Sequence, residues 1–600
     1  MEKSASKFNK QGFTLIESLV GIAVFAIIAI SVYQTFSTAM RLVQISHLMI
    51  TSAALATEQF EIIHNLPYAD VGIISGIPAG SLAAAKNIIR DNADFLIETT
   101  VRNIDDPFDG TIGGTPNDTS PADYKLVEIK ISIPGNSRFT SQSYTEYIAP
   151  KNLENSSTNG ALFIRVFNAS GQPVPEASVH IENNKISPAI IINDVTNKDG
   201  NLQIVDVPPG IEAYEITVTK NSYSQEKTYP LDAPGNPNPV KAHASVLNQQ
   251  VTQISFAIDA VSTLNIKSLT ETCAPVSNIS FSLAGAKQIG TNPVVLKYTN
   301  NFSTDGSGEK NITGLEWDTY NLTVADSTHN LSGTISPVPF SLAPGSTQDV
   351  KVVISPKNPQ SLLISVRQGG TGQPISGAEV KLEKTGFSEQ LITGRGFLRQ
   401  TDWSGGSGQN NFIDQTKYYE SDGNIETTDP AGEIKLKNTF GFYTASGALT
   451  SSAFDTGTSS NFYQLTFTPL DQPAETGADS VRFQIATNNG STTWAYKGPD
   501  GTDSTFYSSA DSNINAVHNN DRYFRYKIYL TTASSTLTPD VGEVNFTFSS
   551  LCVPSGQIMF NGLDSDNYTL TVSKPGYQTI VENITVASPW QQQEITLMPE

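Results

Sequence analysis

The chain has 600 residues, of which 38% are hydrophobic and only 16% are charged, with 37 Lys and Arg against 58 Asp and Glu. A chain of this length exceeds what one hydrophobic core can serve, so several domains are expected. The net charge of −21 would repel a nucleic-acid backbone, and no run of Lys or Arg offers a local basic site, so nucleic-acid binding is not favoured. The many Gly, Pro, Ser, Thr and Asn residues suit short strands joined by tight turns, which predicts a mainly β fold.

The first recognisable segment is a short basic leader followed by an apolar run. Lys7 and Lys10 precede Gly12, and residues 13–32 are almost entirely apolar. A helix of this length rises far enough to cross a bilayer about once. Glu17 interrupts the run, and an unpaired carboxylate in hydrocarbon costs about 2.5 to 3.5 kcal/mol, so Glu17 needs a partner. The alternative is an ordinary secretory leader, but such a leader would place its cleavage signal after the apolar run.

Gly12, Phe13 and Glu17 resemble the class III signal of type IV prepilins and pseudopilins. In that family a prepilin peptidase cuts after the Gly, so the resemblance implies that Phe13 becomes the N-methylated first residue. It also implies that Glu17 is an assembly residue, neutralised by the Phe13 amine of a neighbouring subunit. The implied partners are prepilin peptidase, other pilin subunits and the inner membrane. The chain would cross that membrane once, with its C-terminal head outside the cytoplasm, and lie in a cell-surface filament after assembly.

The segments after the apolar run predict an extended helix and then a small head. Apolar residues recur every three or four positions as far as Ile63, and Pro67 ends the pattern, so one helix is expected over residues 13–66. Alternating apolar residues then predict strands in a small pilin-like α+β head over residues 67–150.

The predicted head contains an acidic loop that has two interpretations. Its carboxylates could bind calcium, the only cofactor considered, or they could belong to a solvated turn, and the spacing matches no EF-hand. The residues concerned are Asp105, Asp106, Asp109, Asp118 and Asp123.

A repeated order of motifs follows. Residues 161–260 contain a Gly-Gln-Pro-Val-Pro segment, an Asp199-Gly200 turn and a strand at Tyr214, an order that resembles the carboxypeptidase regulatory-like domain, a prealbumin-like β-sandwich. The order recurs over 261–356 and begins again at 360–385, but its second half appears only at 554–600. Residues 386–553 are therefore predicted to be a jelly-roll-like β domain inserted in a surface loop of the third of these prealbumin-like or Ig-like sandwiches.

The insert and the two cysteines provide further candidate residues. Arg and Tyr alternate over residues 522–530, which places aromatic rings on one face of a strand. Cys273 and Cys552, the only cysteines, could pair in an oxidising compartment or be buried separately. Four aromatic residues could stack on a sugar ring or form the core of a sandwich, namely Trp403, Trp494, Tyr496 and Tyr507.

No catalytic constellation is recognisable. The six histidines are scattered, and no His-Glu-x-x-His, Gly-x-Ser-x-Gly or phosphate-loop motif occurs, so no enzyme is expected. The favoured interpretation is a non-enzymatic minor pilin or pseudopilin of a type IV filament or related secretion system, which displays a multi-domain β head for surface binding or adhesion. The alternative is a membrane-tethered extracytoplasmic protein that binds or processes glycans.

Overall fold

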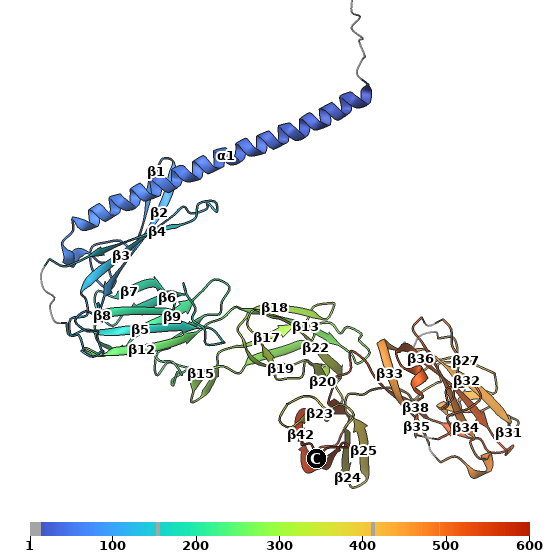
Figure 1. The fold of residues 1–600 in the computed structure, drawn as a ribbon. Coiled ribbons are helices and arrows are strands. Elements are labelled where there is room, and N and C mark those ends of the chain that lie inside the picture. Colours follow the sequence, from blue (N-terminus) through green and yellow to red (C-terminus); the bar gives the residue numbers. More distant parts are fainter. Residues whose placement is uncertain (1–13, 152–156, 410–413, 470, 491, 510) are drawn as a thin grey trace, which may run out of the picture. The chain divides into compact units, whose positions relative to one another are not determined.

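The structure is a computed structural model that describes residues 14–151, 157–409, 414–469, 471–490, 492–509 and 511–600. The chain divides into two compact units, residues 1–259 with 290–293 and residues 260–289 with 294–600. A long helix lies at the N-terminal end of the described chain, and strands dominate the rest (Figure 1). The predicted fold class, mainly β with a long N-terminal helix, is confirmed.

Helix α1 spans Leu15–His64, close to the predicted range of 13–66. Thr14 caps its N-terminus and Asn65 its C-terminus, where Pro67 follows and prevents a further turn. The helix is apolar enough over an 18-residue window, with a mean hydropathy of 2.5, to cross a membrane. Buried side chains begin only at Thr51 and recur at helical spacing to Ile63, so the second half alone contributes a packed stripe.

The stripe packs on a four-stranded antiparallel sheet with the order β1-β2-β3-β4. Strand β2 alternates buried and less buried residues, and Phe95, Ile97 and Val101 join the core with Leu55 of α1. A short 3-10 helix, η1 (Tyr68–Asp70), connects α1 to the sheet. The strands are β1 (Ala85–Arg90), β2 (Ala93–Ile104), β3 (Tyr124–Ser132) and β4 (Gln142–Ile148).

Three sandwiches follow in the chain. The first comprises β5 (Gly160–Phe167), β6 (Ser178–Asn183), β7 (Ile190–Val195), β8 (Asn201–Val207), β9 (Gly210–Thr219), β10 (Glu226–Lys227), β11 (Ala244–Val246) and β12 (Val251–Ala257). The second comprises β13 (Ser262–Leu269), β14 (Ser280–Gly285), β15 (Gln288–Thr291), β16 (Val294–Leu296), β17 (Thr299–Ser303), β18 (Glu309–Leu315), β19 (Asp318–Val324), β20 (His329–Ile335), β21 (Phe340–Leu342) and β22 (Thr347–Pro356). The third comprises β23 (Ser361–Gln368), β24 (Glu379–Lys384), β25 (Phe387–Ile392), β39 (Gln557–Phe560), β40 (Asp566–Ser573), β41 (Ile580–Val586) and β42 (Trp590–Leu597).

The three sandwiches share one topology. In each, the first strand pairs in parallel with the last strand, as β5 with β12, β13 with β22 and β23 with β42. Each also buries a tyrosine whose hydroxyl donates to a backbone carbonyl a few residues earlier, as Tyr214 to Pro208, Tyr320 to Glu316 and Tyr568 to Asp564. The motifs that repeat in the sequence therefore correspond to a repeated arrangement of strands.

The third sandwich is split by a separate β domain, which begins later than the sequence predicts. Strand β25 pairs with β24, so it belongs to the sandwich and the insert starts after Ile392 rather than at residue 386. The predicted boundary is wrong here because β25 lies beyond the last residue that matched the repeated motif. The insert replaces the turn that joins β7 to β8 in the first sandwich and β17 to β18 in the second.

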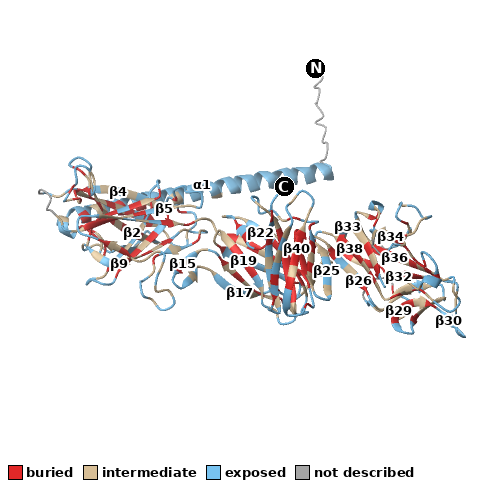
Figure 2. Cartoon of the chain, turned by 90° about the horizontal axis from the view of Figure 1, so that it is seen from below, coloured by how far each residue is buried: buried red, intermediate tan, exposed pale blue. Residues whose placement is uncertain are grey.

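The inserted domain has its own core, coloured as buried in Figure 2. The long strand β33 pairs with β36 at its start and with β38 along the rest, so it connects the two parts of the main sheet. Its elements are β26 (Gly396–Gln400), β27 (Tyr418–Ser421), β28 (Ile425–Thr428), β29 (Ala431–Leu436), β30 (Asn438–Thr439), β31 (Phe442–Tyr443), β32 (Ser446–Ser451), β33 (Phe454–Thr468), η2 (Ala474–Thr476), β34 (Val481–Asn488), β35 (Asp511–Asn513), η3 (Ala516–His518), β36 (Asp521–Thr531), β37 (Asp540–Val541) and β38 (Glu543–Ser549).

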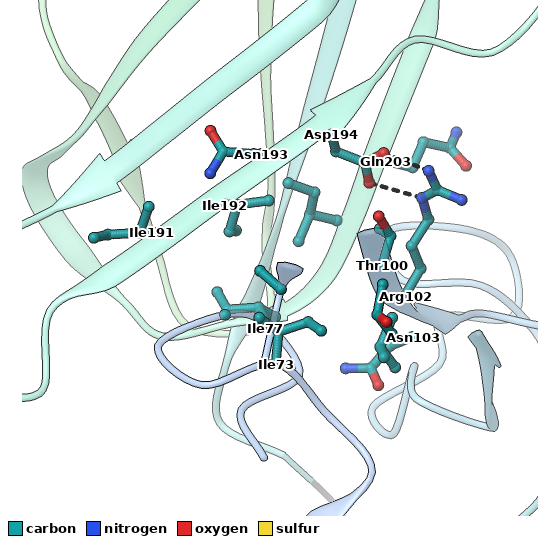
Figure 3. Close-up of a pocket in the computed structure, with 15 residues that line it drawn as sticks. Ile73, Ile77, Thr100, Arg102, Asn103, Ile191, Ile192, Asn193, Asp194 and Gln203 are labelled. Atoms are coloured by element: carbon teal, nitrogen blue, oxygen red, sulfur yellow. Dashed lines mark hydrogen bonds and ion pairs between the residues drawn. The ribbon is translucent and has the colours of Figure 1, made fainter. Parts of the chain in front are cut away.

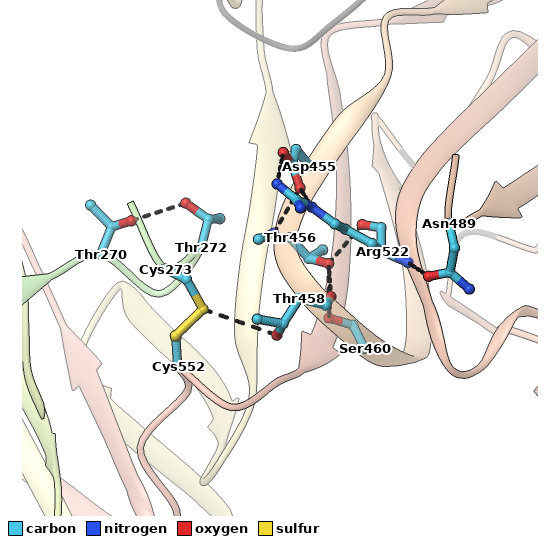
Figure 4. Close-up of polar contacts among 11 residues, drawn as sticks. Thr270, Thr272, Cys273, Asp455, Thr456, Thr458, Ser460, Asn489, Arg522 and Cys552 are labelled. Atoms are coloured by element: carbon cyan, nitrogen blue, oxygen red, sulfur yellow. Dashed lines mark hydrogen bonds and ion pairs between the residues drawn. A yellow bond between two sulfur atoms is a disulfide. The ribbon is translucent and has the colours of Figure 1, made fainter. Parts of the chain in front are cut away.

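The insert is covalently attached to the second sandwich. Cys273 and Cys552 form a disulfide with a Cα–Cα distance of 5.4 Å, across 279 residues of sequence (Figure 4). Close to this bond, the backbone N–H of Phe397, at the start of the insert, donates to the carboxylate of Glu271. Burial raises the pKa of Glu271 to about 7, and that hydrogen bond only partly opposes the effect. Both attachments lie in the loop between β13 and β14.

We expect the folded state to lose stability as pH rises from 4.5 to about 7. The folded state holds a proton on Glu271 that the unfolded chain has released in this window, so deprotonation destabilises the folded state by about 1–3 kcal/mol. Scanning calorimetry of wild type should show a lower melting temperature above the window than below it. Glu271→Gln should remove this part of the pH dependence, whereas the exposed Glu475→Gln should retain it. An identical pH dependence in wild type and Glu271→Gln would contradict the assignment.

Candidate functional site

The N-terminus of α1 carries the candidate assembly residue. Glu17 lies in the first turn, where its backbone N–H donates to Thr14 Oγ1 at 3.3 Å. The backbone N–H and the hydroxyl of Thr14 donate in return to Glu17 Oε2, each at 2.9 Å. Glu17 and Thr14 thus form a capping box, which gives the carboxylate a partner within the helix that the sequence analysis did not foresee. Gly12 and Phe13, the predicted cleavage and methylation residues, lie outside the described residues.

The first half of α1 presents apolar side chains on all sides. Every residue from Thr14 to Phe36 is exposed, and this part of the helix is pale blue in Figure 2. Phe25, Val32 and Phe36 line one shallow hollow on its surface. A predominantly apolar surface of this length is unstable in water, so it requires lipid or other apolar helices around it.

Polar contacts fix the second half of α1 to the head. Glu58 accepts a hydrogen bond from Arg90 at 2.9 Å, and His64 Nε2 lies 2.8 Å from Glu146. At the helix end, the buried ammonium of Lys125 donates to the carbonyls of Tyr68 and Val71 at 2.8 and 2.6 Å. Burial lowers the pKa of Lys125 to about 8. These contacts make the helix and the sheet one folded body.

A partly buried ion pair joins the head to the first sandwich (Figure 3). Arg102 of β2 donates from Nε to Asp194 of β7 at 2.7 Å and from Nη1 to Glu128 at 3.0 Å. Burial would lower the pKa of Arg102, but Asp194 and Glu128 outweigh it and raise that pKa above its ordinary value. Beside the pair, Ile77 and Ile192 line a cavity of about 50 Å³. The cavity is too small for a ligand and marks only the seam between the two sheets.

Breaking this pair should loosen the seam. Asp194→Ala leaves the partly buried Arg102 guanidinium with Glu128 alone, which we expect to cost about 1–3 kcal/mol. Hydrogen exchange measured by mass spectrometry should therefore speed up in peptides from β2 and β7. Glu98→Ala is the matched control, because the half-exposed contact of Glu98 with Lys130 at 3.9 Å contributes less than about 1 kcal/mol. Equal exchange in both variants would show that the seam does not depend on the pair.

The acidic loop buries Asp118 and Asp123 and half-buries Asp105. Each accepts a hydrogen bond from a backbone N–H. Ile112 donates to Asp105 Oδ2 at 2.9 Å, and Ser120 donates to Asp118 Oδ1 at 2.7 Å. Asp106 donates to Asp123 Oδ2. Burial, together with the charges of Asp118, Asp123 and Asp109, raises the pKa of Asp105.

The remaining oxygens leave the calcium prediction open. Asp105 Oδ1 and Asp118 Oδ2 are buried without a hydrogen-bond partner in the described part of the chain. In that same part, no three His, Cys, Asp or Glu side chains are grouped closely enough to hold a metal ion. Calcium binding would therefore require the loop carboxylates to move together, and it stays a prediction.

If the loop binds calcium, millimolar Ca²⁺ should raise the melting temperature of the head relative to EGTA. A ligand that binds only the folded state stabilises it by about 2.7 kcal/mol at one hundred times its Kd. Asp118→Asn should abolish the shift because it removes a charge from the loop, whereas Asp414→Asn, in an exposed turn of the insert, should not. Unchanged melting of wild type in Ca²⁺ and EGTA would rule the site out.

Two of the four candidate ligand aromatics lie in the core. Trp403 is 0% exposed, and its indole N–H donates to the hydroxyl of Tyr526 at 3.0 Å. Tyr507 is 1% exposed, and its hydroxyl accepts from the N–H of Asn515. The prediction that these two rings stack on a sugar is therefore wrong, because no ligand can reach them. Trp494 and Tyr496 are half-buried, and each lies near a cation of β36.

Comparison with known proteins identifies the N-terminal segment. Residues 7–33 match the family model described as the prokaryotic N-terminal methylation motif. This motif overlaps the apolar start of α1, and the motif and the helix together support anchoring in a membrane. No curated protein is detectably similar to the chain.

Several solved structures show weak similarity. The Bacillus anthracis TIE protein is 15% identical, with 45% of this chain and 53% of that chain covered and a TM-score of 0.15. This chain therefore spans about half the length of that protein. GBS52, the minor pilin of Streptococcus agalactiae, is 15% identical over 34% of this chain and 99% of its own, with a TM-score of 0.16. The Streptococcal ancillary pilin is 10% identical over 74% and 99%, with a TM-score of 0.14. TM-scores of this size do not establish a common arrangement of domains.

Proposed function

We propose that this chain is a non-enzymatic minor pilin or pseudopilin of a type IV filament or related secretion system. Its leader would be cut between Gly12 and Phe13 by prepilin peptidase, and Phe13 would be N-methylated. The chain would stay in the inner membrane, with its head outside the cytoplasm, until it joins other pilin subunits at the cell surface. There the β domains would serve surface binding or adhesion.

One observation carries this proposal, namely the change of environment along α1. The helix is apolar and exposed at its start, but from Thr51 onward it belongs to the core of the head. A helix that only tethered a secreted domain would not need to share that core. A helix that packs among neighbouring subunits while holding its own head needs both halves.

Glu17 supplies the proposed contact between subunits. Both hydrogen bonds from Thr14 end on Oε2, and among the described residues no donor contacts Oε1, so Oε1 could accept from a neighbouring subunit. A methylated amine at Phe13 of a neighbouring subunit would pair with this carboxylate in an apolar surrounding, where an unpaired charge is costly. The size of the β head favours sparse incorporation or a tip position, because some four hundred and fifty residues per subunit would crowd a continuous shaft.

Glu17→Ala should be processed normally but excluded from filaments. We expect mass spectrometry to find methylated Phe13 as the first residue in wild type and in Glu17→Ala when each is expressed with prepilin peptidase. The amount of Glu17→Ala in sheared filaments should be at least roughly tenfold lower than that of wild type, because the contact between subunits is lost. Glu61→Ala, an exposed carboxylate on the same helix, should assemble as wild type does. An uncut leader, or cleavage after the apolar run, would contradict the proposal and leave an anchored or secreted adhesin.

The alternative function, a tethered protein that binds or processes glycans, is supported in one respect. The inserted domain carries a sheet face on which cations lie beside aromatic rings, as Arg525 beside Trp494 and Lys527 near Tyr496. The resemblance of the sandwiches to carboxypeptidase regulatory-like domains, and of the insert to a jelly roll, stays a prediction.

A further inference from the structure

Strand β36 separates the core of the inserted domain from an unusual outer face. Phe524, Tyr526, Ile528 and Leu530 are each 0% exposed and point into the core. The alternate residues Arg525, Lys527 and Tyr529 therefore lie on the opposite face of the strand. The sequence pattern of alternating Arg and Tyr thus places the cations, and not the core aromatics, on the outer side.

Neighbouring strands extend this outer face on both sides of β36. Arg482 of β34 lies directly across from Tyr529, and Gln484 lies across from Lys527. On the other side, Thr450 of β32 lies across from Lys527. The face is therefore continuous over at least three paired strands, all in the inserted domain.

Aromatic rings surround the cations of this face. The Arg525 guanidinium lies over the rings of Tyr419 and Trp494, at 4.0 and 4.5 Å from their centroids. Lys527 Nζ lies 5.4 Å from the ring of Tyr529 and 6.0 Å from that of Tyr496. Such contacts hold a cation in place without neutralising its charge.

A second group of contacts continues the arrangement at the other end. The Arg482 guanidinium lies 4.9 Å from the ring centroid of Phe506, which packs edge-on against Tyr529 at 5.2 Å. The Tyr529 hydroxyl donates to Gln484 Oε1 at 3.0 Å. Gln484 in turn donates to the carbonyls of Asp503 and Thr505. The aromatic and amide side chains are thus fixed before any ligand arrives.

Two cations of this face lack carboxylate partners. In the described part of the chain neither Arg482 nor Lys527 forms an ion pair, and Arg482 Nε is buried without a hydrogen-bond partner. Three other cations of the insert do form ion pairs, Arg399 with Glu543, Lys435 with Glu433, and Arg522 with Asp455.

The inserted domain carries a net negative charge, although Arg482 and Lys527 have no carboxylate partner within the described ranges. Residues 394–553 contain 17 Asp and Glu against 10 Lys and Arg, so carboxylates were available to pair with these cations. A partly desolvated cation without an anion nearby is unfavourable, and an external anion could pair with it through charged hydrogen bonds. Glu420, at the edge of the face, is exposed and makes no ion pair among the described residues.

We propose that this outer face binds an acidic saccharide, with a sugar carboxylate at Arg482 and Lys527 and a sugar ring against Tyr496 and Tyr529. This inference rests on the proposed function, since it names the class of ligand that the displayed head would bind. On the protein, cations lie next to aromatic rings that are held in place. An acidic saccharide matches this arrangement, because its carboxylates lie next to the apolar faces of its sugar rings. A nucleic-acid strand also combines anionic groups with flat rings, so a thymidine oligonucleotide is the competing ligand in the test.

The hydroxyl of Tyr496 is already held within the face. Arg525 and Thr450 hydrogen-bond to it, and burial raises the pKa of Tyr496 to about 12. These contacts fix the Tyr496 ring, whose surface is the part that a sugar would contact.

Calorimetric titration of the full chain in detergent micelles with an oligoguluronate tests this proposal. Wild type should bind the acidic oligosaccharide and should not bind the neutral maltohexaose. Arg482→Gln and Lys527→Gln should each weaken binding about tenfold, because each removes one charged hydrogen-bond donor. Arg399→Gln is the matched control, since it removes one positive charge from the same domain at a residue already paired with Glu543. It should bind as wild type does.

Three results would overturn the proposal. The first is the absence of oligoguluronate binding by folded wild type. The second is an equal loss of affinity in Arg399→Gln, which would reduce the effect to net charge. The third is tighter binding of a thymidine oligonucleotide with the same dependence on Arg482 and Lys527, which would make the ligand a nucleic acid. Filament incorporation is measured separately, and the Arg482 and Lys527 variants should still enter filaments, so a failure of assembly is distinguishable from a failure of binding.

Discussion

The architecture depends on one helix that must satisfy two different surroundings. The first half of α1 exposes apolar side chains in every direction, and the second half contributes Leu55, Ala56 and Ile63 to the core of the head. No Gly or Pro interrupts the helix between these halves, so the hydrogen-bonded backbone is continuous from one surrounding to the other. The position of the apolar half therefore fixes the position of the head, and every later domain starts from there along the chain.

Much of the fold can be predicted from the sequence because its signals are local. The apolar run and the three- to four-residue spacing give α1, and Pro67 gives its end to within a few residues. Recurring Gly-Gln-Pro segments at 171 and 372, Asp-Gly turns at 199 and 305, and strands at Tyr214, Tyr320 and Tyr568 give three sandwiches and the interruption of the third. Strand β25 was missed because it lies beyond the repeated motif, so only its pairing with β24 assigns it to the sandwich.

The features that the sequence could not provide are contacts between distant residues. Trp403 and Trp494 look equivalent as residues, yet the first is enclosed by the core and the second lies over Arg525. Arg102 and Asp194 belong to different domains, and no local pattern joins them. The pairing of Cys273 with Cys552 depends on the path of the chain where it leaves the insert and re-enters the third sandwich, which brings Cys552 to a loop of the second sandwich. By contrast, the sequence itself shows the alternation of Arg, Lys and Tyr over residues 522–530, and the structure adds which of these residues face away from the core.

The parallel pairing of first and last strands gives each sandwich a mechanical property. Because β5 and β12 run in the same direction, the chain enters the first sandwich at one end of this pair and leaves it at the other. A force along the chain would then slide the two strands past each other, and the hydrogen bonds between them would share the load instead of opening one after another. The same geometry holds for β13 with β22 and β23 with β42. In a surface protein built in this way, tension between the anchor and the far end of the chain would not unfold the domains strand by strand from their ends.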